Sequence, residues 1–354
     1  IIIGEDLFDE LIAFCSTYSK DNIVVIADSY FKSSENFISS KSKLIAEFKH
    51  IYIEGGIESK GLKELERVLN YLIKYNISKD GLIIAIGGGV VGDLAAFVSS
   101  IYLRGIDLVH VPTSSTAMID SSIGGKTGLN YSEKVNLIGT YQNPKAIFMD
   151  LNFLKSLSNR DYKAGICEAI KMALTSDMPM FERLMKISDK INSRDSQSLI
   201  DLVYWSVVTK LKHVCDDQKE ESIRLLLNYG HTFGQSIETY YGLQQDSLRH
   251  GEAIALGITV AAKMSLLINS NKSTEVLWRK TNQILDKYLL PNRFNKINIS
   301  QVPTKSDLLL NLMNDKKRLH NGNRFILCES IGSANVHVLK DQNLILKAFS
   351  VLYE

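Results

Sequence analysis

Apolar and polar residues follow two different periods along the first half of the chain. The segments NIVVIADSYF, IDLVHVPTS and AIFMDL are short apolar runs, which predict buried strands. In KGLKELERVLNYLIKYNI the apolar residues recur every three or four positions, which is typical of an amphipathic helix. The segment GLIIAIGGGVVGDLAAFVSSIYL indicates a strand, a glycine turn and a helix. Strands that alternate with helices imply a mostly parallel sheet with helices on its faces.

The pattern changes after about Leu157. Long helical stretches dominate, such as RDYKAGICEAIKMALTSD and GEAIALGITVAAKMSLLI, and the late segment GNRFILCESIGSANVHVL predicts a hairpin or a short sheet. We therefore predict two domains, an α/β domain with a parallel sheet over residues 1–157 and a mostly α-helical domain over residues 158–354. A chain of 354 residues is long enough for both.

Charge and cysteine usage narrow the class of protein. The formal net charge is +2 without a long basic run, so we expect no nucleic acid and no membrane as partner. The four cysteines are far apart and form no CxxC pair, which favours a reducing compartment over a disulfide framework. No apolar run reaches the roughly 20 residues that span a bilayer, and no signal-peptide pattern is present. We predict a cytoplasmic protein.

The glycine turn is the first candidate for chemistry. Gly87, Gly89 and Gly92 match G-x-G-x-x-G between a strand and a helix, where backbone N–H groups and the helix N-terminus suit a pyrophosphate. The usual acidic residue about 20 positions downstream is missing, because that region reads VHVPTSS. Asp28, at the end of an earlier strand, could bind the ribose instead, or it could be a turn residue.

A second glycine-rich segment, DSSIGGKTGLN, carries Lys126. Glycine N–H groups and an ammonium suit a phosphoryl oxygen, although the P-loop spacing is absent. The alternative is a surface turn with a solvated lysine. Asn136 follows close behind, and Arg104 in YLRG could add charge or lie on the surface.

A metal site is suggested by ionisable residues in apolar surroundings. Glu168 and Lys171 share one face of the apolar segment GICEAIKMAL, where burial is costly unless the charges are paired or bound to a metal. His231 and His250 each lie beside a glycine. One glutamate and two histidines are a usual ligand set for catalytic zinc. The alternatives are hydrogen-bonded core histidines and a Glu168–Lys171 salt bridge.

The stretch RLLLNYGHTFGQSIETYYG places four polar residues at spacings of four, three and four. On a single helix, those spacings would align Arg224, Asn228, His231 and Gln235 on one face. The spacing therefore predicts one helix with a line of polar side chains in an otherwise mostly apolar segment.

Together these segments closely resemble the 3-dehydroquinate synthase family, within the wider sugar-phosphate cyclases. The matching text is GGGVVGDLAAFVSSIYLRGIDLVHVPTS, DSSIGGKTGLN, NLIGTYQNPKAIFMDLNFLKSL, GICEAIKMAL, LLNYGHTFGQSIE, RHGEAIALGI and DKKR. The resemblance implies an NAD-binding α/β domain, a helical metal- and substrate-binding domain, and an active site in the cleft between them.

The resemblance also implies roles for individual residues. The metal, zinc or cobalt, would be bound by Glu168, His231 and His250. NAD+ would be bound by Asp28, Lys60, Gly88, Gly89, Val90, Asp93, Thr113 and Ser114. The catalytic residues would be Asp120, Lys126, Lys171, Lys210, Arg224 and Asn228. Further substrate contacts would come from Asn136, Gln235, Lys316 and, across a homodimer interface, Arg104.

The implied substrate is a small-molecule sugar phosphate, 3-deoxy-D-arabino-heptulosonate 7-phosphate. Bound NAD+ would transiently oxidise the C5 hydroxyl, so that the acidified C6 proton and the phosphate can leave. Return of the hydride, ring opening and an internal aldol closure would give 3-dehydroquinate. The enzyme would therefore be a carbon–oxygen lyase of the shikimate pathway, which leads to chorismate and the aromatic amino acids.

The sequence departs from the family pattern near the phosphate. Gln235 stands where a second histidine is usual, and Val135 where a lysine is usual. PTSSTA replaces PTTLLA, and Glu58 is shifted by one position from the family's ribose-side acid. Glutamine can donate a hydrogen bond but carries no charge. We hypothesise that phosphate contacts are altered, either for the usual substrate or for a related sugar phosphate.

Three other functions fit these residues less well. A different sugar-phosphate cyclase would have less use for Arg224, which suits a carboxylate. A metal-dependent alcohol dehydrogenase of the glycerol dehydrogenase type would not need Lys126 and Lys210 around a phosphate. A degenerate cyclase kept as a scaffold would not need an intact metal set. We therefore favour dehydroquinate synthase.

Overall fold

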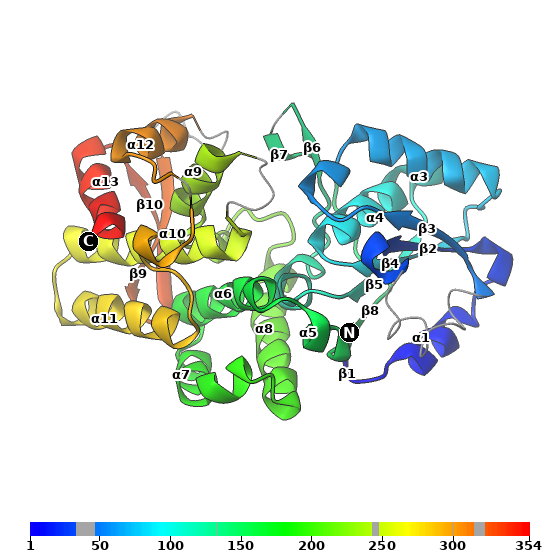
Figure 1. The fold of residues 1–354 in the computed structure, drawn as a ribbon, viewed down its shortest axis with the longest axis horizontal. Helices are drawn as coiled ribbons and strands as arrows, with labels where there is room; N and C mark the ends of the chain where they lie inside the picture. The colour runs from blue at the N-terminus through cyan, green and yellow to red at the C-terminus, as the bar shows by residue number, and fades with distance from the viewer. Residues whose placement is uncertain (33–46, 133, 243–247, 300, 315–322) are drawn as a thin grey trace. The chain divides into compact units, whose positions relative to one another are not determined.

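The structure is a computed structural model, and it describes residues 1–32, 47–132, 134–242, 248–299, 301–314 and 323–354. The chain divides into two compact units, Ile1–Leu157 and Ser158–Glu354 (Figure 1). Each unit has its own set of buried apolar side chains.

The first unit contains a six-stranded sheet with the order β1-β8-β5-β4-β2-β3, and every paired set of neighbours is parallel. The strands are β1 (Ile2–Gly4), β2 (Ile23–Asp28), β3 (Lys49–Ile53), β4 (Leu82–Gly87), β5 (Asp107–Pro112) and β8 (Ala146–Asp150). The central strands are almost wholly buried, as expected for continuous apolar runs in a parallel sheet. The predicted parallel α/β architecture is confirmed.

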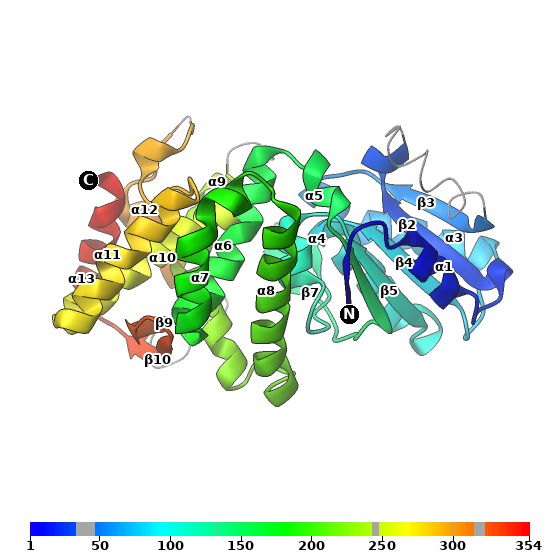
Figure 2. The ribbon, with the colours of Figure 1, turned by 90° about the horizontal axis from the view of Figure 1, so that it is seen from below.

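Helices follow β1, β3, β4 and β8 along the chain. They are α1 (Phe8–Cys15), α3 (Leu62–Lys74), α4 (Gly89–Ile101) and α5 (Asn152–Ser156). Helix α4 packs on β4 and β5, and α3 packs on β3 and α4. Figure 2 shows β4 between β2 and β5, so the carboxyl ends of these three strands lie next to one another. Ligands of open α/β sheets bind at such an edge.

A small antiparallel hairpin, β6 (Leu129–Tyr131) and β7 (Lys134–Ile138), follows the segment DSSIGGKTGLN. A π-helical turn, Ala117–Ser121, precedes that segment and carries Asp120. The hairpin packs against α3 and α4.

The second unit is mostly helical, as predicted. Its helices are α6 (Asn159–Ser176), α7 (Met178–Asn192), α8 (Ser196–Asp216), α9 (His231–Tyr241), α10 (His250–Ile268), α11 (Lys272–Lys287), α12 (Lys305–Met313) and α13 (Gln342–Phe349). Helix α10 lies at the centre and packs against α6, α9, α11 and α13. Within the described ranges, α10 is long and apolar enough to cross a membrane, yet 72% of its apolar stretch is buried inside the protein.

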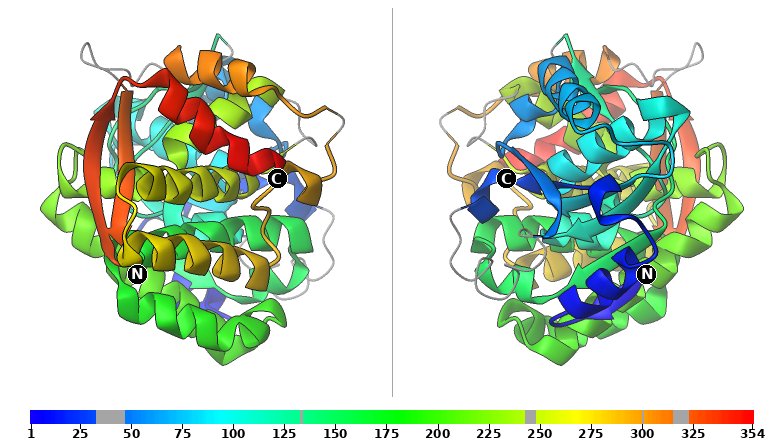
Figure 3. Two further views of the ribbon diagram at one scale, coloured as in Figure 1. Left: turned by 90° about the vertical axis from the view of Figure 1, so that its left-hand side faces the viewer. Right: turned by 90° about the vertical axis from the view of Figure 1, so that its right-hand side faces the viewer.

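The predicted late hairpin is present as β9 (Asn323–Ser330) and β10 (Ser333–Leu339), which pair antiparallel. Its turn contains Gly332 at φ +83°, a conformation that suits glycine. Strand β9 packs against α10 and α11, and Figure 3 shows this pair of strands beside those helices.

The single helix expected through Arg224, Asn228, His231 and Gln235 is wrong. Residues Ile223–Asn228 form a 3₁₀ helix, and Gly230 then adopts φ +78° before α9 begins at His231. A side chain at Gly230 would lie 2.7 Å from Ile258 Cγ1 and 2.8 Å from the Ile258 backbone nitrogen. Tight packing on α10 therefore breaks the helix at a residue that tolerates positive φ.

Candidate metal and anion site

Three predicted ligands come together in the second unit. One ligand atom each from Glu168, His231 and His250 lies within 4.8 Å of the others. Glu168 is on α6 and is 1% exposed, whereas His231 and His250 are the first residues of α9 and α10. The His250 Nε2 atom is 3.4 Å from Glu168 Oε1. The two imidazole rings lie 5.4 Å apart between centroids.

The second nitrogen of each ring faces an oxygen that orients it. His250 Nδ1 is 2.8 Å from Glu238 Oε1, and His231 Nδ1 is 3.4 Å from the Tyr229 carbonyl oxygen. An acceptor at Nδ1 holds the proton there and leaves Nε2 free to bind a metal. Glu238 was missed in the sequence, although it follows His231 by seven residues and shares its helical face.

Lys171 forms a buried ion pair with Glu168. Its Nζ donates to Glu168 Oε2, and the two side chains are 2% and 1% exposed. Burial acts to raise the pKa of Glu168, but the Lys171 charge and the two histidines outweigh it and hold that pKa well below its usual range. The carboxylate is therefore ionised and ready to bind a cation.

The site fits a divalent metal. Glu168 Oε1 is buried and has no hydrogen-bond partner among the described residues. Tetrahedral zinc with bonds of about 2.0–2.1 Å has ligand atoms about 3.4 Å apart. That spacing matches the 3.4 Å between His250 Nε2 and Glu168 Oε1. Three ligands also leave the fourth position for a substrate oxygen.

Arg224 and Asn228 lie in the 3₁₀ segment just before the predicted metal ligand His231. Arg224 is 2% exposed, and its Nη1 donates to the Gln218 carbonyl oxygen at 2.7 Å. The Asn228 amide donates to Glu220. This segment packs on α6 and α8, the helices that carry Lys171 and Lys210. Three cations, Arg224, Lys171 and Lys210, and the Asn228 amide therefore belong to elements that pack together in this unit.

Asp217 organises the turn that precedes Arg224. Its carboxylate accepts from the backbone N–H groups of Glu221, Ser222 and Arg224 at 2.9, 2.7 and 3.1 Å. Sequence reasoning missed this residue, because one aspartate in the polar run DDQKEES gives no local signal. By fixing the turn, Asp217 sets where the Arg224 side chain begins.

The glycine turn of the first unit has the predicted strand–turn–helix form. Strand β4 ends at Gly87, Gly88 is the N-cap, and α4 begins at Gly89. A Cβ atom would lie 3.4 Å from Ser114 Oγ at Gly88, and 3.3 Å from Ser121 Oγ at Gly89. Glycine therefore keeps the backbone N–H groups open beside two hydroxyls, at the positive end of a helix dipole.

Asp28 ends β2, the strand next to β4. Its Oδ1 accepts from the Tyr30 backbone N–H at 2.9 Å. Burial raises the pKa of Asp28, and Glu54 adds to that effect. Gly55 leaves space beside the carboxylate, because a Cβ atom there would be 3.7 Å from both oxygens. The adjacency of β2 and β4 explains why the acid precedes the glycine turn in the sequence.

Lys60 joins three segments of the first unit. It is 6% exposed, and its Nζ donates to Asp93 on α4 and to Asn136 on β7. Asn136 has a positive φ of 53°, and its backbone N–H donates to Asn130 Oδ1 at 3.0 Å. The structure thus places Lys60, a predicted cofactor residue, in direct contact both with a second predicted cofactor residue, Asp93, and with the predicted substrate residue Asn136.

The remaining predicted residues are dispersed within their units. Thr113 and Ser114 follow β5, and the Thr113 N–H donates to the Gly87 carbonyl at 3.0 Å. Lys126 is exposed, and its backbone forms an isolated antiparallel β-bridge with Tyr141. Arg104 is exposed and has a φ of +62°. Gln235 lies one turn after His231 on α9. Lys316 lies outside the described residues.

Comparison with known families gives two adjoining matches. The model of the 3-dehydroquinate synthase N-terminal domain matches residues 50–164, and that of the 3-dehydroquinate synthase C-terminal domain matches residues 165–318. A 3-dehydroquinate synthase from Prochlorococcus marinus (strain AS9601) is 34% identical over 98% of this chain and 94% of its own length. One from Helicobacter pylori (strain P12) is 36% identical over 91% and 90%.

Among solved structures, the fold is similar to that of a 2-epi-5-epi-valiolone synthase from Streptomyces hygroscopicus subsp. jinggangensis 5008. The TM-score is 0.86 at 21% identity, with 99% of this chain and 96% of the other covered. That protein was solved with NAD+ and Zn2+ bound. At this identity the similarity shows a shared fold.

Proposed function

Because the chain belongs to the 3-dehydroquinate synthase family, we propose that it converts 3-deoxy-D-arabino-heptulosonate 7-phosphate to 3-dehydroquinate with release of phosphate. The observation that carries the proposal is the Glu168, His231 and His250 cluster beside buried Lys171. It joins a metal ligand set to a cation, as a phosphorylated, hydroxyl-bearing acid requires.

Glu168, His231 and His250 would bind the divalent metal, and Asp28 with the glycine turn would bind NAD+. When bound, NAD+ supplies reversible hydride transfer at C5 of the substrate, and the metal polarises the C5 oxygen. Glu238 orients His250 through Nδ1, so that Nε2 faces the ligand position. The glycine turn offers its N–H groups and the α4 dipole to a pyrophosphate.

The cations of the second unit would bind the anionic groups of the substrate. Lys171, Lys210 and Arg224 are 2%, 5% and 2% exposed, so their charges are only weakly screened by water. Arg224 offers a planar pair of donors that suits a carboxylate. Asn228 adds a neutral amide for a hydroxyl. Preorganised charge of this kind lowers the barrier for phosphate departure.

The test is phosphate release from 3-deoxy-D-arabino-heptulosonate 7-phosphate with NAD+ and zinc, with and without a chelator. We expect metal-dependent release without accumulation of NADH, because the hydride returns to the product. Glu168→Gln should abolish release, whereas Glu182→Gln, at an exposed glutamate on α7, should not change it. No release by protein that binds zinc and NAD+ would point to a different sugar phosphate. Accumulation of NADH would instead indicate a dehydrogenase.

We also propose a homodimer in the cytoplasm. The β6–β7 hairpin exposes Tyr131, Val135 and Leu137. Leu103 and Arg104 both have positive φ, which is strained for residues other than glycine, and a partner could hold them there. The four cysteines are unpaired, as a reducing compartment would keep them.

Sedimentation of Leu137→Asp tests the dimer. We expect a charge on this apolar face to give a monomer. Leu310→Asp, at an exposed residue of α12 in the other unit, should behave like the parent. A parent protein that sediments as a monomer would refute the proposal.

A further inference from the structure

One stripe of α6 faces the beginning of α10. Asp161 and Glu168 are seven residues apart and therefore share a helical face, with Ala164 between them. Asp161 Oδ1 accepts from Arg249 Nε at 2.6 Å, just before α10. Glu168 Oε1 lies 3.4 Å from His250 Nε2, at the first residue of α10. The face of α6 that carries the proposed metal ligand Glu168 therefore also contacts the N-terminal end of α10.

Between these two contacts the helices touch backbone to backbone. A Cβ atom at Gly251 would lie 1.8 Å from the Ala164 carbonyl oxygen. No side chain separates the helices there, so interlocking side chains do not fix their mutual rotation at this point. Contacts beyond the crossing must therefore fix how α10 is turned, and with it where His250 points.

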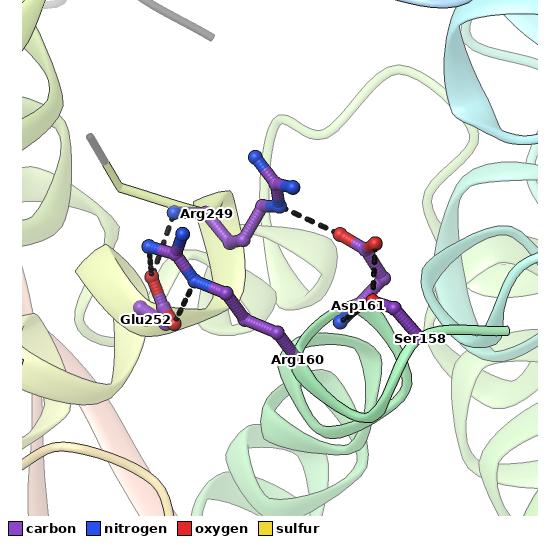
Figure 4. A network of polar contacts seen from close by, with 5 residues as sticks. All are labelled: Ser158, Arg160, Asp161, Arg249 and Glu252. Atoms are coloured by element: carbon purple, nitrogen blue, oxygen red, sulfur yellow. Dashed lines mark hydrogen bonds and ion pairs between the residues drawn. The ribbon is translucent and has the colours of Figure 1, made fainter. Parts of the chain in front are cut away.

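A second ion pair supplies such a contact, and Figure 4 shows it beside the first. Arg160 on α6 donates to both carboxylate oxygens of Glu252 on α10, each at 2.7 Å. Glu252 Oε2 also accepts from the Arg249 backbone N–H at 2.9 Å. The bidentate pair restricts direction as well as distance. The N-terminal ends of α6 and α10 thus each contribute one arginine and one carboxylate, and each arginine pairs with the carboxylate of the other helix end.

The same carboxylate caps α10. Helix N-termini have unpaired N–H groups, and the first turn frays when they are not satisfied. His250 occupies the first helical position, so fraying would displace a metal ligand directly. Glu252 is anchored by Arg160, and its side chain is only 13% exposed. The cap is therefore tied to the helix that carries Glu168.

We propose that Arg160–Glu252 and Asp161–Arg249 form a clamp that positions His250 against Glu168 and so preorganises the metal site. This inference rests on the proposed metal-binding function. These four are positioning residues, since they act through the helix ends. Ligands that must be ordered on binding give weaker affinity than ligands already in place. Supporting contacts around metal ligands typically change metal affinity about 10–100-fold.

The experiment is a Co²⁺ titration of the metal-free protein of residues 1–354, followed by visible absorption. We expect Arg160→Met to weaken Co²⁺ binding about tenfold or more and to alter the absorption bands. Arg160→Lys should restore part of the affinity, because it keeps the charge but not the bidentate geometry. Arg279→Met is the matched control, at an exposed arginine of α11, and should bind like the parent.

The metal-free variants are compared at a temperature at which fluorescence shows each to be folded, so that unfolding is separated from weak binding. If Arg160→Met does not fold, Asp161→Asn removes the other ion pair. The backbone N–H of residue 161 still donates to the capping oxygen, Ser158 Oγ. A parental dissociation constant and spectrum in the folded clamp variant overturn the clamp. A parent protein that binds no Co²⁺ overturns the proposed metal site itself.

Discussion

Replacing Lys171 with methionine tests the electrostatics of the site most directly. The methionine keeps an unbranched side chain of similar length but leaves Glu168 without its buried partner. Removing one member of a buried ion pair typically costs about 3–5 kcal/mol, because the other charge stays desolvated. A domain has only about 5–15 kcal/mol of stability. We therefore expect metal-free Lys171→Met to lose a large part of the stability of the second unit.

Zinc should restore much of that loss. A bound divalent cation would supply positive charge to Glu168 in place of the ammonium, so it should stabilise Lys171→Met more than the parent. Zinc raises the free energy of unfolding of the variant and of the parent by different amounts. The difference between these two increases measures how far the lysine and the metal compensate the charge of the same carboxylate.

Urea unfolding followed by tryptophan fluorescence gives the measurement. The two tryptophans of the chain, Trp205 and Trp278, lie on α8 and α11, so the signal reports on the second unit. With a urea slope of about 2 kcal/mol/M, a loss of about 4 kcal/mol lowers the midpoint by about 2 M. Lys186→Met, at an exposed lysine of α7, is the matched control and should shift it little.

Two results would refute this reasoning. A metal-free Lys171→Met protein with the parental midpoint would mean that Glu168 does not depend on the lysine. An equal loss with and without zinc would mean that Glu168 is not a metal ligand, or that the loss comes from packing.

Three further predictions concern single residues. Burial lowers the pKa of His110 to about 4, below its unfolded value of about 6.5. The folded protein therefore loses stability as the pH falls from about 6.5 towards 4. At pH 5.5 the loss amounts to about 1.4 kcal/mol. His110→Gln should remove this part of the acid sensitivity, and melting temperatures at pH 7.5 and 5.5 would show whether it does. Glu238→Gln should weaken zinc binding about 10–100-fold in a chelator competition, and an unchanged dissociation constant would exclude the orienting role. Gln235→His should lower KM for the phosphorylated substrate by adding charge, and unchanged KM and kcat would show that this position does not matter.

The sequence alone determined the class of each unit. Apolar runs of strand length between amphipathic helices were enough to predict the parallel sheet, because both signals are local and periodic. The candidate metal ligands could also be predicted from the sequence, because a glutamate in an apolar helix needs a compensating cation wherever the chain places it. The motifs of a known family then supported the same ligands.

Only the tertiary structure decided how the site is held. The break at Gly230 depends on the close approach of α10, which the helical spacing of Arg224 and His231 does not reveal. Glu238 meets His250 twelve residues away, and Arg160 meets Glu252 across 92 residues. Local patterns encode which face of a helix is buried. They do not encode which helix covers that face or how the two cross, and the orienting and clamping contacts depend on that crossing.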